Sequence, residues 1–273
     1  MIFYPDVGGL DLGGVGVGGP GLGNMLFPWA RAIVYQKKYG GEILAPCWIQ
    51  VKPRRLLVGE RDQRNYRGFF SSEKYITGFR REFTRLLKPS IDEDSIEKAK
   101  SGGVVVTVSG MRNLFDDILH ERDLIKKSFN DMLNINMDDE VLPKEYIAVH
   151  VRLGDFALTE DPTKNNSRIP MAWYAKSIKL LQSQLNLPVL LFSDGSSDEL
   201  QDLLELDGVE RVELETALHE MLALANSSAL ITSGSTFSMW ASFLGNTNSY
   251  WYPGKLNFPE VFCGSNNLNL ILK

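Results

Sequence analysis

The second half of the chain alternates short apolar runs with longer stretches in which apolar residues recur at helical spacing. Such short runs are typical of buried strands, and apolar residues at i, i+3, i+4 and i+7 are typical of amphipathic helices. The pattern predicts strands at 146–151, 188–192, 210–214, 229–232 and 249–252. It predicts helices near 171–184, 197–206, 215–226 and 236–244. This alternation favours an α/β fold with mostly parallel strands.

The first half of the chain shows a similar but less regular alternation. Strands are predicted at 1–4, 42–45 and 104–108, and helices at about 25–39 and 124–133. Asn24 stands where it would cap the first helix, and the paired glycines after Tyr39 suit its end. A polar segment at 137–143 is interpreted as a connection, which predicts one domain at 1–140 and another at 141–273.

Composition describes a globular protein of ordinary character, with 44% hydrophobic and 23% charged residues among 273. No apolar run reaches the roughly 18 residues that a membrane span needs, and the first residues lack the pattern of a secretion signal. We therefore expect a cytoplasmic protein. Cys47 and Cys263 are too few and too far apart for a disulfide framework or a close Cys-x-x-Cys pair, and we expect two reduced thiols.

Charge is distributed unevenly around a net value of −5. Residues 48–90 contain 11 basic and 4 acidic side chains. This segment is either a solvated basic face or a surface that attracts an anionic substrate or an acidic membrane, and we expect it to line the acceptor side. Nucleic acid is a less suitable partner, because the whole chain is acidic and no known binding module accompanies the segment. The sequence gives no oligomeric state.

An imidazole and a guanidinium stand at the end of the strand predicted at 146–151. Side chains alternate along a strand, so His150 and Arg152 share one face. Ligands of open α/β sheets bind outside the carboxyl ends of the strands. An arginine there presents a fork of donors suited to phosphate or carboxylate.

Two further strand ends carry polar groups that would reach the same edge. Asp194 follows the strand at 188–192, where its carboxylate could accept donors from a base or ribose, cap the next helix, or do both. A hydroxyl-rich turn with Ser235 and Thr236 leads into the helix at 236–244. Free amides and the positive end of the helix dipole favour an anion at such a turn.

Nine glycines lie between Gly8 and Gly23, and the spacing Gly-x-Gly-x-x-Gly occurs twice among them. The dinucleotide fingerprint also needs an acid near the end of the second strand, whereas Glu42 stands at that strand's beginning. A nicotinamide site is therefore disfavoured. We interpret 19–24 as a loop whose backbone closely approaches a ligand, and a flexible surface loop is the alternative.

Four motifs in this order resemble the bacterial alpha-1,2-fucosyltransferase family and the wider GDP-fucose-dependent superfamily. They are Gly19-Pro20-Gly21-Leu22-Gly23-Asn24-Met25-Leu26-Phe27, His150-Val151-Arg152-Leu153-Gly154-Asp155, Phe192-Ser193-Asp194, and Ser235-Thr236-Phe237-Ser238-Met239-Trp240-Ala241. The resemblance implies a GT-B-like fold, with two Rossmann-like domains of mostly parallel sheets facing a central cleft. It also implies an acceptor-side N-terminal domain and a C-terminal domain that binds the nucleotide sugar.

The same resemblance implies roles for individual residues. Arg152 would hold the diphosphate, His150 would contact the nucleotide, and Asp194 would read guanine or ribose. The phosphate would be cradled by Ser235, Thr236 and Phe237, and the cleft would be closed from the other side by Gly21, Gly23 and Asn24. The chain departs from the family pattern at Met25, at Leu153 and in the Gly234-Ser235-Thr236 turn.

The activity implied is that of an inverting, metal-independent glycosyltransferase in glycan biosynthesis. It would move fucose from GDP-fucose to a hydroxyl, the 2-OH of a galactoside, on a surface glycan. Arg152 and a helix N-terminus can stabilise the departing diphosphate, so we expect no metal and no cofactor. The acidic triplet 92–94 has the letters of a metal-binding Asp-x-Asp, but it opens a polar helical stretch and is interpreted as charge at a helix start.

A general base must take the proton of the acceptor hydroxyl. Asp155 is the candidate, with Glu160 and Asp161 in reserve; alternatively, Asp155 merely orients Arg152 through an ion pair or turn. His150 is expected to act as a positioning donor rather than as the base. His120 and His219 stand in helical contexts and are expected to be structural.

Three other functions stay open at this point. They are a transferase of the same architecture that uses another nucleotide sugar, an NAD(P)-dependent oxidoreductase, and a non-catalytic nucleotide- or glycan-binding protein. A peripheral association with an acidic membrane surface at its inner face is also compatible with the charge pattern. Thermal stabilisation by GDP, UDP, CMP, NAD or NADP would distinguish the nucleotides, because only ligands of the folded form raise the melting temperature.

Overall fold

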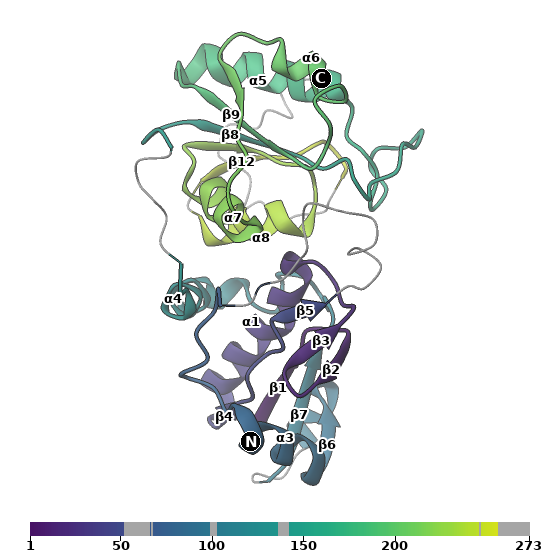
Figure 1. Ribbon diagram of the computed structural model, residues 1–273, viewed down its shortest axis with the longest axis vertical. Helices are drawn as coiled ribbons and strands as arrows, with labels where there is room; N and C mark the ends of the chain where they lie inside the picture. The colour runs from purple at the N-terminus through teal and green to yellow at the C-terminus, as the bar shows by residue number, and fades with distance from the viewer. Residues whose placement is uncertain (52–65, 67, 99–102, 136–141, 246, 256–273) are drawn as a thin grey trace. The chain divides into compact units, whose positions relative to one another are not determined.

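The computed structural model describes residues 1–51, 66, 68–98, 103–135, 142–245 and 247–255 (Figure 1). The chain divides into two compact units, Met1–Asn136 and Met137–Lys273. The polar segment at 137–143, Cys263 and most of the basic residues of 48–90 lie wholly or largely outside the described residues. Among the described residues, no helix is both long and apolar enough to cross a bilayer.

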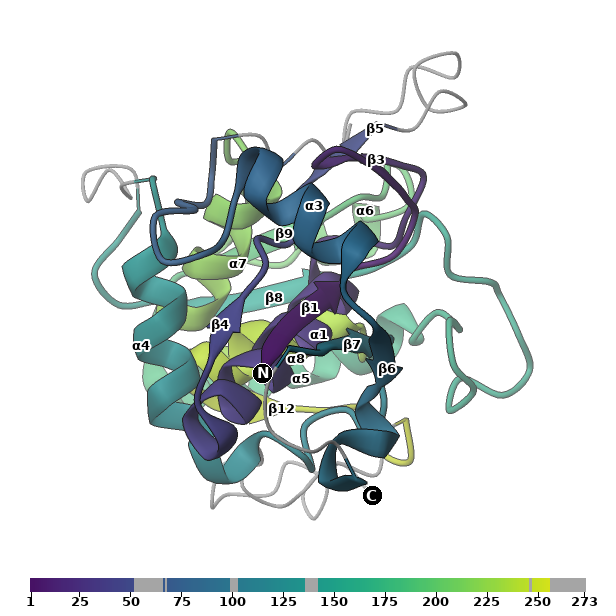
Figure 2. The same cartoon turned by 90° about the horizontal axis from the view of Figure 1, so that it is seen from below.

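The N-terminal unit is built on a parallel sheet whose described strands follow the order β4-β1-β7-β6. The strands are β1 (Ile2–Asp6), β4 (Glu42–Ile43), β6 (Ser90–Asp92) and β7 (Val105–Ser109). Ile2 pairs with Glu42 on one side and with Val105 on the other. Figure 2 looks along this unit, with β1 beside β4 and β7. The predicted strands at 1–4, 42–45 and 104–108 are confirmed: β1 and β7 form the middle of this sheet, and β4 forms one edge.

Helix α1 (Leu22–Tyr39) packs against β1 and β7 and is buried over its first three turns. It begins three residues earlier than predicted, with Gly21 as its N-cap, so the prediction that Asn24 caps it is wrong. Asn24 instead lies in the first turn, where its backbone amide donates to the Gly21 carbonyl at 3.0 Å. The Tyr66 hydroxyl accepts the Leu22 amide at 3.1 Å and supplies the acceptor that a capping side chain would otherwise provide.

The remaining described helices of this unit are α3 (Gly78–Leu87), α4 (Arg122–Met132) and the 3-10 turns η1 (Glu93–Lys98) and η2 (Leu119–Glu121). The acidic triplet does begin a helical turn, and Asp92 accepts the Asp94 amide at 3.0 Å. Glu93 is different from a solvated helix-start charge, because it is buried. Its carboxylate accepts two bonds from Arg31, at 3.0 and 3.1 Å, and one from the Tyr35 hydroxyl at 3.1 Å.

Part of the glycine-rich stretch forms a hairpin that the sequence interpretation missed. Strands β2 (Leu10–Leu12) and β3 (Val15–Val17) pair antiparallel, and β3 pairs in parallel with β5 (Ile49–Val51). The turn is made by Gly13 and Gly14, whose φ angles of 67° and 92° suit a two-residue hairpin turn. Gly14 and Gly16 of these matches thus lie in the hairpin, whereas Gly18, Gly19 and Gly21 lie between β3 and the start of α1.

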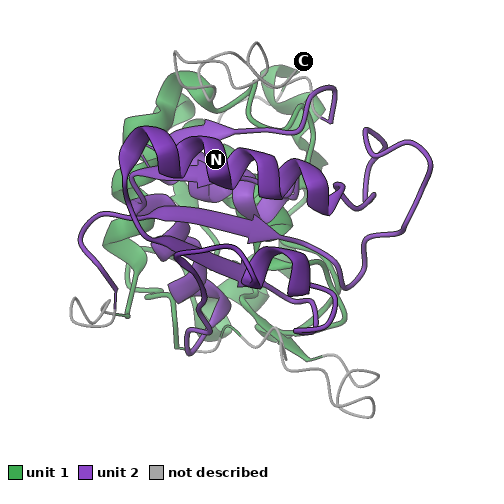
Figure 3. Ribbon diagram, turned by 90° about the horizontal axis from the view of Figure 1, so that it is seen from above, with its two compact units in different colours: residues 1–136 green, residues 137–273 purple. Residues whose placement is uncertain are grey.

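The C-terminal unit holds a parallel sheet whose described strands follow the order β10-β9-β8-β11-β12 (Figure 3, purple). They are β8 (Ile147–Val151), β9 (Val189–Ser193), β10 (Val209–Arg211), β11 (Ala229–Ile231) and β12 (Asn248–Tyr250). Ile147 is in register with Val189 and with Ala229. All five strands predicted in this half are confirmed, with shorter bounds for the outer ones.

Helices cover both faces of this sheet, as an α/β fold requires. Figure 1 shows α5 (Met171–Leu185) and α6 (Gln201–Leu204) on one side, with α7 (Ala217–Asn226) and α8 (Thr236–Leu244) on the other. Ile147, Val149 and Val151 belong to the core on the α5 side, so the predicted alternation along β8 is confirmed. The helix predicted at 197–206 is only one turn long, and Ser196 and Glu199 exchange side-chain-to-backbone bonds in the turn that precedes it.

Candidate active site

The order of strands in the C-terminal unit marks the place where a ligand site is expected. From β8 the chain first adds β9 and β10 on one side, and later adds β11 and β12 on the other. Such a reversal leaves a crevice beside the carboxyl end of the first strand, at the point where the connections diverge. His150 and Arg152 stand at this end of β8, and the turns after β9 and β11 flank them.

Arg152 follows the last residue of β8, and two carboxylates orient its guanidinium. Its Nε and Nη2 lie 2.9 and 2.8 Å from Oδ1 of Asp155, and its Nη1 lies 2.9 Å from Oδ2 of Asp194. The Arg152 side chain is 23% exposed, so the charge is held at the surface of the unit rather than inside it. The fork is therefore fixed in direction and still accessible to an anion.

Asp194 ties the end of β9 to the turn after β8. Its two carboxylate oxygens accept the backbone amides of Leu153 at 2.8 Å and Gly154 at 3.1 Å. A Cβ on residue 154 would lie 2.5 Å from Oδ2 of Asp194, so glycine is required for this close approach. The alternative that Asp194 caps the next helix is wrong, because its oxygens bond this turn rather than the first turn of α6.

His150 is buried beneath this edge, with Nδ1 3.0 Å from the Ser233 hydroxyl and its ring centre 5.3 Å from that of Phe237. Burial, with a smaller contribution from the Arg152 charge and against the opposing charge of Asp194, lowers the pKa of His150 to about 4. The imidazole is therefore neutral near pH 7. A neutral imidazole presents one donor and one acceptor nitrogen, which suits hydrogen bonding more than acid catalysis.

The turn between β11 and α8 is a cluster of buried hydroxyls. Ser233 Oγ lies 2.9 Å from Ser235 Oγ and 3.2 Å from Ser238 Oγ. Ser235 is the N-cap of α8 and accepts the Ser238 amide at 3.3 Å, so its hydroxyl is used within the protein. Thr236 and Phe237 open the helix and are half-buried. The hydroxyl groups thus fix the N-terminus of α8 close to His150.

Lys255 fastens this turn to the loop after Arg152, and the sequence interpretation missed it. Its ammonium donates to the carbonyls of Pro162 and Lys164, both at 2.9 Å, and to that of Ser167. Gly234 has a φ of 70°, and a Cβ there would lie 2.6 Å from Cγ of Lys255. A single lysine near a Pro-Gly pair carries no pattern, so only the folded chain reveals this contact.

The remaining residues singled out in the sequence lie in other parts of the structure than the hydroxyl-rich turn and the end of β8. Glu160 is exposed in the loop held by Lys255, and Asp161 accepts the Thr163 amide at 3.0 Å, which together with the Thr163 hydroxyl lowers the pKa of Asp161. Gly21, Gly23 and Asn24 belong to the N-terminal unit, at the start of α1. His219 contacts Thr216, the N-cap of α7, at 2.8 Å and is structural as expected.

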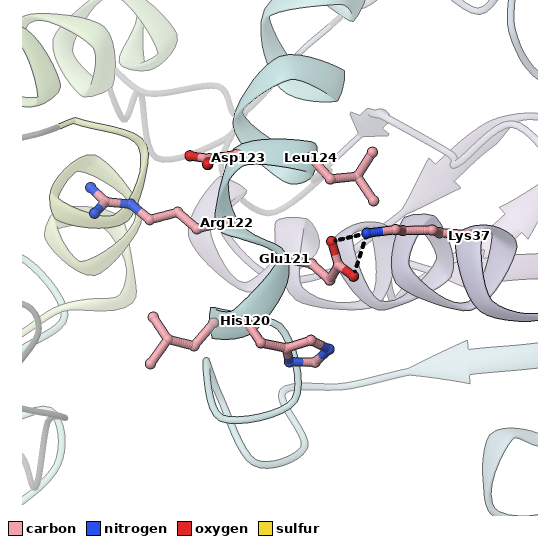
Figure 4. Close-up of a pocket in the computed structure, with 7 residues that line it drawn as sticks. Lys37, His120, Glu121, Arg122, Asp123 and Leu124 are labelled. Atoms are coloured by element: carbon pink, nitrogen blue, oxygen red, sulfur yellow. Dashed lines mark hydrogen bonds and ion pairs between the residues drawn. The ribbon is translucent and has the colours of Figure 1, made fainter.

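Figure 4 shows a hollow of about 520 Å³ in the N-terminal unit, between α1 and the start of α4. Two of its charged lining residues pair with each other, since the Lys37 ammonium lies 2.6 and 2.7 Å from the two carboxylate oxygens of Glu121. His120 also lines it. This hollow has a lining of its own, separate from the edge around Arg152. In the part of the chain that the structure describes, no group of three or more His, Cys, Asp or Glu side chains is placed to hold a metal ion.

The sequence of residues 103–252, more than half of the chain, matches glycosyl transferase family 11. The chain belongs to glycosyl transferase family 11. This membership confirms the predicted resemblance and identifies a glycosyltransferase. The matched range contains the whole β8-to-β12 sheet and every residue discussed around Arg152 except Lys255. Among curated proteins, none matches this sequence significantly.

Two solved structures of POFUT1 share the architecture of this family 11 chain. POFUT1 in complex with GDP-fucose is 10% identical, with a TM-score of 0.55 and coverage of 92% of this chain and 97% of that one. POFUT1 in complex with GDP is 12% identical with a TM-score of 0.54 and the same coverage. Fucosyltransferase NodZ from Bradyrhizobium is 13% identical with a TM-score of 0.48, covering 93% and 96%. The predicted α/β, GT-B-like fold is confirmed.

Proposed function

We propose that the protein transfers fucose from GDP-fucose to a sugar hydroxyl, and that the nucleotide sugar binds at the carboxyl end of β8. One observation carries the proposal: the guanidinium of Arg152 is held between Asp155 and Asp194 where the strand order reverses. Similar folds in complex with GDP-fucose or GDP support this choice of donor.

The proposed reaction requires the site to stabilise the leaving group, which is the nucleoside diphosphate. As the bond from the anomeric carbon breaks, negative charge grows on the departing diphosphate. Arg152 supplies a fixed positive charge, and the N-terminus of α8, beginning at Thr236, supplies amides and the positive end of a helix dipole. Because both are oriented before the reaction, they stabilise this charge without rearrangement.

His150 and Phe237 would contact the nucleotide from below the diphosphate. The neutral imidazole, bonded through Nδ1 to Ser233, offers a hydrogen bond without adding charge. Asp194 already accepts two backbone amides, so its role is to hold the edge in shape, and its remaining lone pairs are available to a ribose or base.

Asp155 has two candidate roles, and its geometry favours orientation over proton transfer. One carboxylate oxygen receives both Nε and Nη2 of Arg152, which fixes the guanidinium plane. The oxygen that receives both nitrogens is occupied by the arginine and is not free to take the proton of an acceptor hydroxyl. We therefore assign Asp155 to positioning Arg152 and keep Glu160, exposed in the adjacent loop, as the candidate base.

The N-terminal unit, with Gly21, Gly23 and Asn24 at the start of α1, is proposed to serve the acceptor side. The acceptor proposed is the 2-OH of a galactoside on a surface glycan, and inversion at the anomeric carbon follows from direct displacement by this hydroxyl. We propose that the reaction takes place in the cytoplasm, where activated sugars are used.

The nucleotide is tested by thermal unfolding of the whole protein with GDP, UDP, CMP, NAD or NADP. We expect a rise in melting temperature with GDP that exceeds the rise with any other nucleotide. A rise with NAD alone would overturn the proposal in favour of an oxidoreductase. Transfer is tested separately with GDP-fucose and galactosides, and binding without any product or donor hydrolysis would indicate a non-catalytic binding protein.

A further inference from the structure

Helix α3 of the N-terminal unit turns Arg81 and Arg85 inward and its large apolar side chains outward. Arg81 is 3% exposed, whereas Phe79 is 86% and Phe83 59% exposed. Leu86 and Leu87 are 73% and 76% exposed. A surface helix ordinarily has the opposite arrangement, with its apolar stripe against the core. The outward face of α3 is therefore unexplained by folding of the unit alone.

A buried polar network holds the helix in this orientation. Asp11 of β2 pairs with Arg81 and with Arg85, the latter at 3.0 Å, and accepts the Tyr4 hydroxyl at 2.8 Å. Arg81 Nε also donates to the Ala45 carbonyl at 2.8 Å. Rotating α3 to bury its phenylalanines would break all of these bonds. The unit thus presents the apolar face rigidly.

The outward residues form one continuous stripe, because Phe79, Phe83, Leu86 and Leu87 follow the spacing i, i+4, i+7 and i+8. Four such side chains offer on the order of 600 Å² of apolar surface, at the upper end of what monomers expose. Two copies paired through this stripe would bury no more than about 1,200 Å², the lower limit for a stable interface. A bilayer surface requires no matching partner surface, because an interfacial helix buries its apolar face about 5–10 Å into the boundary between headgroups and acyl chains.

Charge around the stripe matches an anionic surface. Arg80 borders it with a side chain that is 67% exposed, although it also bonds Glu42, and Lys88 follows the last turn and is exposed. The acidic residue of the helix, Glu82, is paired with Arg81 and Arg85. In sequence, 48–90 has 11 basic and 4 acidic residues within a chain of net charge −5; of these, Arg81 and Arg85 are paired inward, and six basic residues lie outside the described part of the chain. Juxtaposed basic residues and large apolar side chains are what anionic headgroups attract.

We propose that α3 is an interfacial helix that binds the surface of an anionic lipid bilayer. Phe79, Phe83, Leu86 and Leu87 enter the boundary between headgroups and acyl chains, and Arg80 and Lys88 lie at headgroup level. This inference goes beyond the transferase activity and does not depend on the identity of the donor. It assigns the N-terminal unit a second role, the attachment of the enzyme to a membrane surface.

The test is co-sedimentation of the whole protein with vesicles of phosphatidylcholine, with and without phosphatidylglycerol. We expect binding to the anionic vesicles that weakens with added salt. Phe79→Ser combined with Phe83→Ser should lower the partition coefficient on the order of 100-fold, because two phenylalanines no longer leave water. Lys88→Gln should lower it about fivefold, and only for the anionic vesicles.

The hairpin provides a matched control within the same unit. Leu10 and Leu12 are 61% and 59% exposed and point to the face of β2 opposite Asp11, so Leu10→Ser with Leu12→Ser should leave vesicle binding unchanged. Unchanged thermal unfolding of both double variants verifies that they fold. The proposal is overturned if the wild-type protein does not bind anionic vesicles, or if the hairpin variant loses binding equally. A dimer that Phe79→Ser and Phe83→Ser dissociate, without vesicle binding, would assign the stripe to a second copy.

Discussion

At the level of single residues, the proposed binding of phosphate by Arg152 depends on how the neighbouring groups hold its guanidinium. A guanidinium binds phosphate well only where its plane is fixed, because free rotation of the long side chain costs entropy on binding. Asp155 fixes this plane through one oxygen, and Asp194 fixes the turn beneath it. We therefore propose that the two acids position Arg152 and its turn and do not touch the reacting atoms.

Asp155→Asn tests the positioning role. The neutral amide cannot accept both arginine nitrogens as an ion pair, so we expect donor affinity to fall about tenfold. Turnover at saturating donor should fall less than affinity. The measurement is titration calorimetry with GDP beside steady-state kinetics. Glu213→Gln is the matched control, since Glu213 is also exposed and also pairs with an arginine, Arg211, at 3.3 Å. If turnover collapsed while GDP affinity stayed intact, Asp155 would be the base.

The depressed pKa of His150 predicts how the free energy of unfolding depends on pH. Its pKa in the folded protein, about 4, lies below the ordinary value of 6.5, so the unfolded chain binds the proton more tightly. Stability from this group is complete above pH 6.5 and is lost as pH falls toward 4, by about 3 kcal/mol.

Urea unfolding of the wild type and of His150→Asn at pH 7 and pH 4.5 measures this loss. The wild type should lose more stability than the variant between the two pH values, because only the wild type must take up this proton on unfolding. His219→Asn, which changes an accessible histidine at a helix cap, should behave like the wild type. Equal losses in the wild type and His150→Asn would contradict the assignment of a depressed pKa.

Strand alternation alone predicts that His150 and Arg152 share one face of β8. It does not predict the hydrogen bonds that hold these two side chains and the turn after them in place. Leu153 and Gly154 are joined to Asp194 through backbone amides, which leave no trace in side-chain patterns. Ser235 is predicted to help to cradle the phosphate, and that stays a prediction; the sequence pattern did not show that its hydroxyl also accepts the Ser238 amide as the N-cap of α8. The sequence shows which side chains reach the edge, and tertiary contacts decide which of them remain available.

At the scale of elements, buried apolar strands were predicted well because their alternation and length are local properties. The hairpin β2–β3 was missed since nine glycines obscure the alternation of Leu10, Leu12, Val15 and Val17. Helix α1 was predicted to start too late, because a glycine N-cap depends on the Tyr66 hydroxyl, far away in sequence. Glu93 was assigned to a helix start because its partner, Arg31, is brought to it only by the fold.

The 3-10 turn η1 offers two glutamates for comparison. Glu93 is buried and paired with Arg31, so Glu93→Gln leaves a buried guanidinium without its counter-charge and should cost about 3–5 kcal/mol of unfolding free energy. Glu97 on the same turn pairs with Lys38 at the exposed surface, and Glu97→Gln should produce no measurable change. Chemical denaturation of both variants measures the difference. Similar stabilities for the two variants would show that the Arg31–Glu93 pair does not hold the N-terminal unit together.

At the scale of the whole molecule, the α/β class and the family could be predicted because ordered motifs cover most of the chain. The strand order β10-β9-β8-β11-β12 could not, since neighbouring strands in a sheet are chosen by long-range packing rather than by local pattern. That order matters for the proposal, because ligands of open α/β sheets bind where the strand order reverses, and here that place is the end of β8 at Arg152.

The proposed mechanism needs no divalent cation, since Arg152 and the start of α8 neutralise the leaving diphosphate. We expect the transfer rate to be the same in EDTA as in added Mg²⁺ or Mn²⁺. The measurement is the initial rate of fucose transfer after exhaustive dialysis against chelator. Complete loss of activity, restored by either metal, would mean that a cation carries the charge assigned to Arg152.

The most direct test of the central claim compares GDP binding by Arg152→Ala and Arg168→Ala. Both arginine side chains are 23% exposed, and each pairs with carboxylate, Arg168 with Glu199 at 2.9 Å. Arg152→Ala should weaken GDP binding about 10- to 100-fold in titration calorimetry and reduce transfer, with unliganded thermal unfolding unchanged. Arg168→Ala should bind GDP like the wild type. Undiminished GDP affinity and product formation in Arg152→Ala would contradict the account.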